Sequence, residues 1–211
     1  MKKVSSILKK SDKEVMKIVR QLQVAYKLKR TLRYATKRDL NQHNESVAEH
    51  VFALFFLAQY FVAHEDLSSK FNTEKLHQIL LFHDFGEITH GDVPTHWKTK
   101  NHEERERIAA KMIFANFPSP LYKNGYRSWN DYESQKSREA CFAYALDKVE
   151  PLFELMNPIN ARSMKRLRFT LEDHLAKKIP ATKDFPVMRK FVDVVTREMV
   201  KNDIFWQNDK R

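Results

Sequence analysis

Apolar residues recur every three or four positions along most of the chain, a spacing typical of helices that bury one face. Ser11 and Glu14 have the spacing of a capping box and precede an apolar stripe, which predicts a basic N-terminal helix over residues 11–30. No segment alternates convincingly as a strand would. We therefore expect an all-α, single-domain bundle of about six to eight helices across residues 1–211. The further predicted helices cover residues 46–61, 72–83, 101–117, 131–156, 161–178 and 184–205.

Glycine and proline indicate where these helices stop. The chain has three glycines among 211 residues, a scarcity that disfavours turn-rich β-sandwiches and barrels and also a glycine-rich nucleotide-binding loop. Residues 31–45 are expected to connect the first two helices. The other expected breaks are two loops, marked by Gly86, Gly91 and Pro94 and by Pro118, Pro120 and Gly125, and a helix end at Pro158.

Positive charge is concentrated at the start of the chain. Residues 1–40 carry 13 Lys and Arg against three acids, whereas the remaining 171 residues carry 25 against 24. A basic segment on a nearly neutral body can attract phosphates, nucleic acid or an acidic membrane surface. The alternative is a solvated helix face that its lysines keep soluble. Charge alone therefore identifies no partner.

Cysteine content and hydropathy narrow the class of protein. Cys141 is the single cysteine, which excludes an internal disulfide and a cysteine-cluster zinc site. The chain has no run of 18 apolar residues and no apolar stretch behind its first lysines, so we expect neither a membrane span nor a signal peptide. These patterns predict a cytoplasmic protein without a membrane partner.

Three polar residues occupy positions that helical spacing assigns to the core. His50 lies four residues before Leu54, His83 lies four residues after Ile79, and Asp147 follows an apolar run. A lone core histidine is more often structural than a ligand, and a buried carboxylate needs a partner. Three such residues on three separate predicted helices favour a metal site instead. Imidazole and carboxylate together suit Zn, Mn, Fe or Co.

The residue that follows His83 completes a recognisable set. Asp84 is its neighbour at a predicted helix end, where both side chains can reach one ion. The set resembles the signature of the HD-domain superfamily of metal-dependent phosphohydrolases, which is a histidine, a later His-Asp pair and a distant aspartate. Here the histidine is His50 in ESVAEH, the pair opens HDFGE, and the aspartate is Asp147 in ALDK. The resemblance implies a metal-binding core over about residues 25–155 in which His50, His83, Asp84 and Asp147 hold the ion.

The stretch that begins with the His-Asp pair is similar to the short 5'-deoxynucleotidase-like members of that superfamily. It reads HDFGEITHGDVPT, from His83 to Thr95. The resemblance implies that Glu87 performs acid–base catalysis or positions the attacking water, and that Asp92 holds the sugar hydroxyl at the catalytic site, with Thr95 also binding substrate. The competing interpretations are a surface glutamate and a turn-capping aspartate.

The resemblance also implies a pair of residues that contacts the phosphate. The related proteins place an arginine and a bulky aromatic residue shortly before the first metal histidine, and Arg33-Tyr34 is the nearest equivalent. It lies farther from His50 than the family pattern, and it has tyrosine where bacterial relatives have tryptophan. Arg38 or Lys37 could replace it, or Arg33 could be one more member of the basic segment.

The positions of the remaining histidines and acids indicate how many metal ions the site holds. Dinuclear relatives add two histidines well downstream, whereas His90, His96 and His102 follow the His-Asp pair closely. We therefore predict one divalent ion, chosen from Mn, Co, Zn, Fe, Mg and Ni. Glu49 and Glu150 are interpreted as partners of the ligands or as surface residues. Glu133 would lie about 21 Å from Asp147 on an unbroken helix, so it reaches the site only if that helix breaks or another chain contributes.

These features lead to one preferred function and two alternatives. The preferred function is hydrolysis of (deoxy)nucleoside 5'-monophosphates to nucleoside and phosphate, with a homodimer implied by the resemblance. Within the same enzyme class, a nucleoside triphosphate hydrolase or an alarmone hydrolase would use the same metal core. The alternative of another class is a non-catalytic module with a structural metal, whose basic first forty residues bind nucleic acid.

Overall fold

Helices make up every regular element of the computed structural model, which describes residues 10–34, 41, 44–67, 71–94 and 96–207. The all-α expectation is confirmed, and an isolated bridge between Leu32 and Ser46 is the β-type pairing found within these residues. Thr95, Lys37 and Arg38 lie outside the described residues. The elements are α1 (Asp12–Leu22), a 3-10 helix η2 (Gln23–Lys29), α2 (Val47–His64), α3 (Thr73–Phe82), α4 (Glu87–His90), α5 (Lys100–Ala115), α6 (Leu121–Ser134), α7 (Arg138–Glu154), α8 (Pro158–Arg166), α9 (Leu171–Ala181) and α10 (Pro186–Lys201).

Capping residues explain where several helices begin. Ser46 and Glu49 form a capping box at the start of α2, and the side chain of Asn72 accepts the backbone N–H of Lys75 at the start of α3. Such caps satisfy N–H groups that have no partner inside the helix. The caps at Ser46 and Asn72 agree with the helix starts predicted from sequence.

The helix predicted over residues 131–156 is in fact two helices. α6 ends before Gln135, whose φ of 47° lies in the left-handed region, and Ser137 then caps α7 through the N–H of Ala140. A similar break divides the predicted helix 161–178, because Thr170 and Asp173 form a new capping box for α9. In both places the apolar spacing continues across the break, but a local capping residue starts a new helix.

Three smaller expectations were also wrong. Residues 11–30 form an α-helix only to Leu22 and continue as the 3-10 helix η2. Pro158 does not end a helix, because it occupies the first turn of α8, where its missing N–H costs nothing. Gly125 lies inside α6 and not in a loop: a Cβ there would lie 2.5 Å from the Phe114 ring, so glycine permits α5 and α6 to pack closely.

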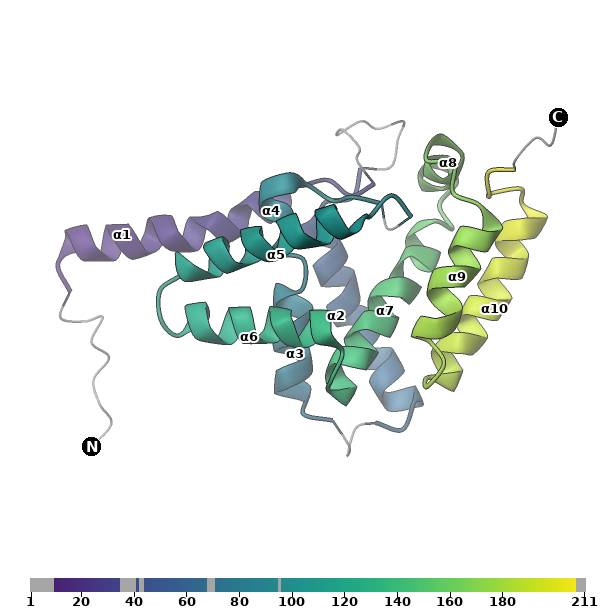
Figure 1. Ribbon diagram of the computed structural model, residues 1–211. Helices are drawn as coiled ribbons and strands as arrows, with labels where there is room; N and C mark the ends of the chain where they lie inside the picture. Colours follow the sequence, from purple (N-terminus) through teal and green to yellow (C-terminus); the bar gives the residue numbers. More distant parts are fainter. Residues whose placement is uncertain (1–9, 35–40, 42–43, 68–70, 95, 208–211) are drawn as a thin grey trace.

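The core surrounds α7, which packs against α2, α3, α6, α9 and α10. Figure 1 shows α9 and α10 on one side of α7 and α5 and α6 on the other. Fully buried side chains from several helices fill the space between them, including Leu54, Phe61, Ile79, Phe142, Leu146 and Met188. Each contributes roughly 1.5–3 kcal/mol through burial, so α7 is held firmly at the centre.

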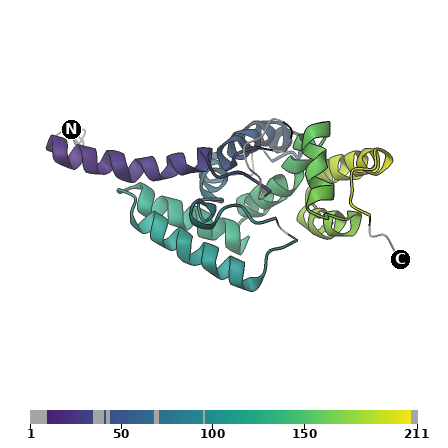
Figure 2. The same cartoon turned by 90° about the horizontal axis from the view of Figure 1, so that it is seen from above.

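α1 and α2 differ in how they use their apolar residues. α1 extends away from the bundle and buries none of its residues (Figures 1 and 2). α2 is long and apolar enough, by length and composition alone, to span a membrane, which the sequence pattern did not suggest. It packs against α3, α7 and α10, which accounts for part of that composition, but 39% of its length is buried and Phe52, Phe56 and Tyr60 are exposed. One face of α2 thus belongs to the core of the bundle, and that face carries the fully buried His50.

Candidate metal centre and active-site cavity

His50 is the buried hub of the candidate site. The capping box at Ser46 starts α2 so that His50 points into the bundle, where it has 0% exposure. Its Nε2 atom lies 3.1 Å from Oδ1 of Asp147 and 3.8 Å from Oδ2 of Asp84. One imidazole nitrogen therefore faces two carboxylates that come from distant parts of the chain.

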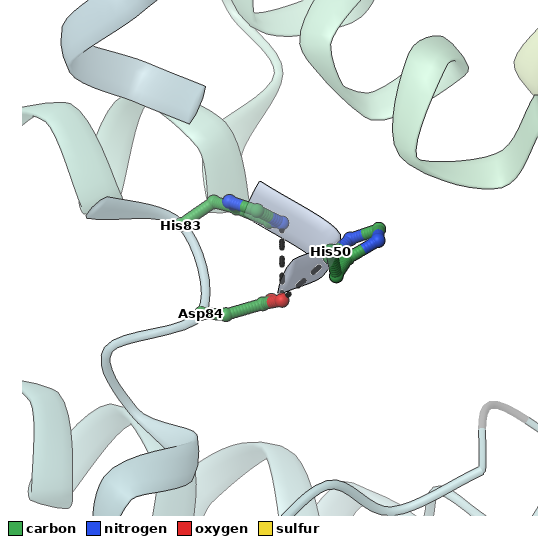
Figure 3. Close-up of side chains that lie close together, drawn as sticks. All are labelled: His50, His83 and Asp84. Atoms are coloured by element: carbon green, nitrogen blue, oxygen red, sulfur yellow. Dashed lines mark ion pairs between the residues drawn. The ribbon is translucent and has the colours of Figure 1, made fainter. Parts of the chain in front are cut away.

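His83 and Asp84 approach the same point from the end of α3. Figure 3 shows both side chains directed toward His50. Nδ1 of His83 donates to the backbone carbonyl of Leu80 at 2.9 Å, so the neutral ring carries its lone pair on Nε2. That Nε2 atom lies 3.2 Å from Oδ2 of Asp84, yet it makes no hydrogen bond within the described residues. A lone pair and a carboxylate that face each other in this way suit a shared cation.

Asp147 completes the set from the middle of α7. Its Oδ2 atom accepts hydrogen bonds from the Tyr132 hydroxyl at 2.7 Å and from the Lys148 ammonium at 2.6 Å, while Oδ1 faces His50. The structure thus brings together all four side chains that the sequence analysis assigned as metal ligands. Oxygen and nitrogen atoms of His50, His83 and Asp84 lie within 4.8 Å of one another, which fits a divalent ion.

The electrostatics of this group favour positive charge. Burial raises the pKa of Asp84, but interactions with the neighbouring imidazoles of His83 and His50 outweigh it and hold that pKa below its usual value. Burial and Arg33 lower the pKa of His50, but Glu150 and Asp147 have the larger combined effect and raise that pKa to about 10. The carboxylates therefore stay ionised and attract a cation to their midst.

A second polar network lies behind His50 and is closed. Nδ1 of His50 lies 2.9 Å from Glu150 and 2.5 Å from Nη1 of Arg33. The same Nη1 atom donates to Glu150 at 3.0 Å and to Glu45 at 3.1 Å. Glu45, His50 and Glu150 could also be grouped as metal ligands, but the Arg33 guanidinium already supplies the positive charge there. Glu150 is thus a buried partner of a candidate ligand, whereas Glu49 serves the helix cap.

Glu87 lies at the start of α4 and is 6% exposed, so the interpretation as a surface glutamate is wrong. Its Oε2 atom is buried and finds no hydrogen-bond partner in the described part of the chain. Burial raises the pKa of Glu87 well above its ordinary value, and the nearby carboxylates of Asp84 and Asp92 raise it further. Glu87 therefore places a buried carboxyl group, with a raised pKa, near the candidate metal ligands.

Asp92 joins the loop after α4 to the Arg33-Tyr34 segment. Gly91 has a φ of 76°, which turns the chain as glycine readily permits, and Asp92 then accepts the backbone N–H of Tyr34 at 2.5 Å. The Tyr34 carbonyl accepts a hydrogen bond from Arg166 of α8 at 2.7 Å. The guanidinium of Arg33 lies over the Tyr34 ring, 5.0 Å from its centroid. Asp92 thus positions the predicted substrate-binding pair in addition to facing the site.

A cavity of about 390 Å³ is lined by three of the four candidate ligands, His83, Asp84 and Asp147, and we call it the main cavity. The predicted residues Arg33, His83, Asp84, Glu87, Asp92 and Asp147 line it. Its walls also carry three lysines, Lys98, Lys148 and Lys177, and a group of acids that includes Glu106 and Glu133. A cavity lined by both metal-ligand types and ammonium groups can accept an anionic substrate.

Several cavity residues were missed by sequence reasoning. Tyr132 and Lys148 both contact Asp147, and Lys98 pairs with Glu106 at 3.0 Å. Glu133 reaches the cavity because the helix breaks, which is one of the two conditions stated for it. Ser137, followed by residues that suit a first helical turn, was the signal for that break. Nothing in the sequence indicated Lys98 and Lys148, because a lysine that lines a cavity and a lysine on the surface look alike in sequence.

Comparison with known proteins shows the family to which the chain is related. A family model described as HD domain matches residues 25–186. The protein named 5'-deoxynucleotidase HDDC2 from Mus musculus is 30% identical over 139 residues, which cover 65% of this chain and 67% of the relative. The protein of the same name from Homo sapiens is 31% identical over 115 residues, or 54% of each chain.

Solved structures share the fold at low sequence identity. A predicted metal-dependent phosphohydrolase from Magnetospirillum magnetotacticum MS-1 has a TM-score of 0.72 and 24% identity, over 92% of this chain and 98% of that one. An HD-domain phosphohydrolase from Listeria innocua has a TM-score of 0.56 and 20% identity, over 89% of each chain. At these identities the likeness concerns the fold alone.

Proposed function

The chain belongs to the HD-domain family of phosphohydrolases, and from this premise we propose that it hydrolyses (deoxy)nucleoside 5'-monophosphates to nucleoside and phosphate. The observation that carries the proposal is a buried cluster of imidazoles and carboxylates at the wall of a 390 Å³ cavity that the buried carboxyl group of Glu87 also lines. The name of the mammalian relatives, 5'-deoxynucleotidase, supports the choice of substrate.

We propose that His50, His83, Asp84 and Asp147 hold one divalent ion, of Mn, Co, Zn, Fe, Mg or Ni. When bound, such an ion polarises a phosphoryl oxygen and acidifies water. The carbonyl of Leu80 keeps the His83 ring in the tautomer whose Nε2 lone pair faces the cluster. Glu150 and Arg33 hold the opposite edge of the His50 ring, so its Nε2 stays directed toward Asp147.

Glu87 has the properties that the hydrolytic step needs. Hydrolysis breaks the bond between phosphorus and the 5' oxygen and forms a bond from phosphorus to a water oxygen. The departing oxygen gains a proton, and the attacking water gives one up, which Glu87 can take as it loses its own. A buried carboxyl group whose pKa is raised can supply that proton at neutral pH. Asp92 would hold the sugar hydroxyl, with Arg33 and Tyr34 positioned beside it. Lys98 and Lys148 offer positive charge to the phosphate.

The alternatives predict different products. A triphosphate hydrolase would release tripolyphosphate, and an alarmone hydrolase would release pyrophosphate. A nucleic-acid-binding module with a structural metal would need neither the cavity nor Glu87. Dimer formation and a cytoplasmic location stay predictions.

The test is a screen of substrates against metals. We expect free phosphate from deoxy- and ribonucleoside 5'-monophosphates in the presence of at least one of Mn, Co, Mg and Zn. The Asp84→Asn protein is the negative control, and Asp193→Asn on the exposed face of α10 is the matched control that keeps activity. Release of tripolyphosphate or pyrophosphate in place of phosphate, or no turnover with any metal, would contradict the proposal.

A further inference from the structure

A second, smaller recess adjoins the main cavity and is largely apolar. It has a volume of about 80 Å³, and we call it the side pocket. It shares Arg33, Asp92, Asp147, Lys148 and Lys177 with the walls of the main cavity. Its remaining walls are mostly apolar and come from the loop after α4, from α7 and from the segment that runs from α8 to α9, including Pro94, Pro151, Leu155, Met164, Leu167 and Phe169.

Two imidazoles in these walls carry buried nitrogen atoms without partners. His174 of α9 is 1% exposed: its Nε2 atom lies 2.8 Å from the Thr196 hydroxyl, and Nδ1 has no hydrogen-bond partner among the residues described. Nε2 of His96 donates to the Leu167 carbonyl at 3.0 Å, so the lone pair of the neutral ring lies on Nδ1, which is also buried and unpartnered within the same residues. Burial lowers the pKa of His174 to about 3, with a smaller effect of Lys178, so His174 is neutral.

Lys178 adds a hydrogen-bond donor to the same recess. It is 7% exposed and lines the side pocket, and its Nζ atom donates to the backbone carbonyl of Lys148. Burial, followed by the nearby charge of Lys148, lowers the pKa of Lys178 to about 7. An ammonium or amine group has more hydrogen atoms than this one contact uses. The apolar walls of the side pocket are therefore combined with the amine of Lys178 and with the Nδ1 atoms of His96 and His174. Apolar walls with a few polar groups are typical of specific ligand sites.

We propose that the side pocket is the subsite for the nucleobase, in which a planar heterocycle packs on the apolar walls and directs its polar edge toward His174, His96 and Lys178. This inference rests on the proposed function. An aliphatic ligand would fill the walls but would leave the buried nitrogen atoms without partners, which is unfavourable. A nucleobase has ring and exocyclic groups that both donate and accept. Because Asp147 and Lys148 line both recesses, one nucleotide can place its phosphate at the ligand cluster and its base in the side pocket.

The main variant is His174→Phe, which keeps the size of the ring and removes its nitrogen atoms. The substrates are dAMP, dCMP, dGMP and dTMP, with 2-deoxyribose 5-phosphate as the substrate that lacks a base. We expect kcat/KM for the best nucleotide to fall about tenfold, mainly through KM, while the rate with 2-deoxyribose 5-phosphate is unchanged. His174→Gln should retain more of the nucleotide activity. His77→Phe, a histidine on α3 outside both recesses, is the control.

A second variant and a binding measurement keep the test decisive. Lys178→Met replaces the buried amine by an apolar chain of similar length and should show the same preference against nucleotides. Saturation-transfer NMR with deoxyadenosine and deoxycytidine detects base binding without catalysis, and both variants should weaken it. If the wild type hydrolyses nothing but binds these nucleosides in a way that His174→Phe abolishes, the proposed function fails and the subsite stands.

Three results would overturn the subsite. Equal losses with nucleotides and with 2-deoxyribose 5-phosphate would show that His174 acts on the structure of the enzyme only. Unchanged kcat/KM for every nucleotide in both variants would leave the nucleotidase intact but without this subsite. Absence of nucleoside binding by the wild type, together with equal activity on nucleotides and on 2-deoxyribose 5-phosphate, would likewise exclude it.

Discussion

The two edges of the His50 ring face two very different surroundings. On one edge, Nε2 faces Asp147 and Asp84 at the wall of the main cavity. On the other edge, Nδ1 meets Glu150 and Arg33 in a buried network in which a guanidinium neutralises carboxylates. We call the first the open edge and the second the closed edge.

The difference shows that one buried polar cluster can bind a ligand at one edge of the His50 ring and hold the ring in place at the other. The closed edge has its charges matched inside the protein, so it needs nothing more and fixes the ring. The open edge leaves atoms such as Nε2 of His83 without hydrogen bonds among the described residues, and it accumulates negative charge. A site that binds a ligand must keep polar atoms and charges that the protein itself does not satisfy, and this lowers the stability of the fold.

The largest effect is expected from removing a charge on the open edge. Asp147→Asn keeps the shape of the side chain but loses the charge that faces His50, so bound metal and activity should both fall, the activity by at least about 1000-fold. Metal content is measured by mass spectrometry and activity by phosphate release. Asp193→Asn, an equivalent change on the exposed face of α10, should alter neither. Metal retention with full activity in Asp147→Asn would remove Asp147 from the site.

A smaller loss is expected for Glu87→Gln, which changes the chemistry without changing the candidate ligands. We expect kcat to fall roughly 100- to 10,000-fold, as for loss of a general acid, with metal content unchanged. Burial, Asp84 and Asp92 raise the pKa of Glu87, so this carboxyl group loses its proton at a higher pH than an ordinary glutamate does. The wild-type kcat should therefore fall toward alkaline pH, and the variant should lack this limb. A kcat near that of the wild type would contradict the role of Glu87.

Weakening the closed edge should have an indirect and more moderate effect. Glu150→Gln removes the carboxylate charge beside Nδ1 of His50 while preserving size. Metal affinity should fall about 10- to 100-fold, because partners of metal-binding histidines orient and polarise the ring. Competition with a chelator measures this affinity, and Glu172→Gln at the exposed start of α9 is the matched control. An unchanged affinity would mean that the closed edge supports the fold alone.

The smallest effect concerns stability and depends on pH. Burial and Lys148 lower the pKa of Lys178 from 10.5 to about 7, so between these values the unfolded chain holds a proton that the folded chain has lost. This group therefore makes the wild type more stable as pH rises through the window. Lys178→Met has no such group, so its gain in Tm should be a few degrees near pH 6 and should shrink toward pH 10. A gain that is constant or grows with pH would contradict the lowered pKa.

Sequence spacing was enough to predict which side chains meet at the open edge and to suggest Glu150 as a partner, but not the contacts that complete the closed edge. His50, His83 and Asp147 stand out because they interrupt apolar stripes whose helical period is local information. The contact between Arg33 and Glu150 joins residues 117 positions apart, and no periodic pattern encodes it. Tyr132 was hidden by the expectation of one continuous helix, because its approach to Asp147 depends on the break at Gln135.

The side pocket lay beyond sequence reasoning for a similar reason. His174 looks like an ordinary helical histidine, and the packing of α9 against α7 and α10 leaves its Nδ1 atom without a hydrogen-bond partner among the described residues. Lys178 follows one helical turn later and looks like a surface residue in sequence, yet packing buries it. Tertiary packing decides which polar residues are matched and which are left for a ligand.

The most direct test of the account is the position of a bound metal. Crystals grown with Mn²⁺ and measured for anomalous scattering should show a single strong peak on the open edge, within coordination distance of His50, His83, Asp84 and Asp147. A peak among Glu45, His50 and Glu150 on the closed edge, or no peak near His50 at all, would contradict the claim that the open edge is the metal site.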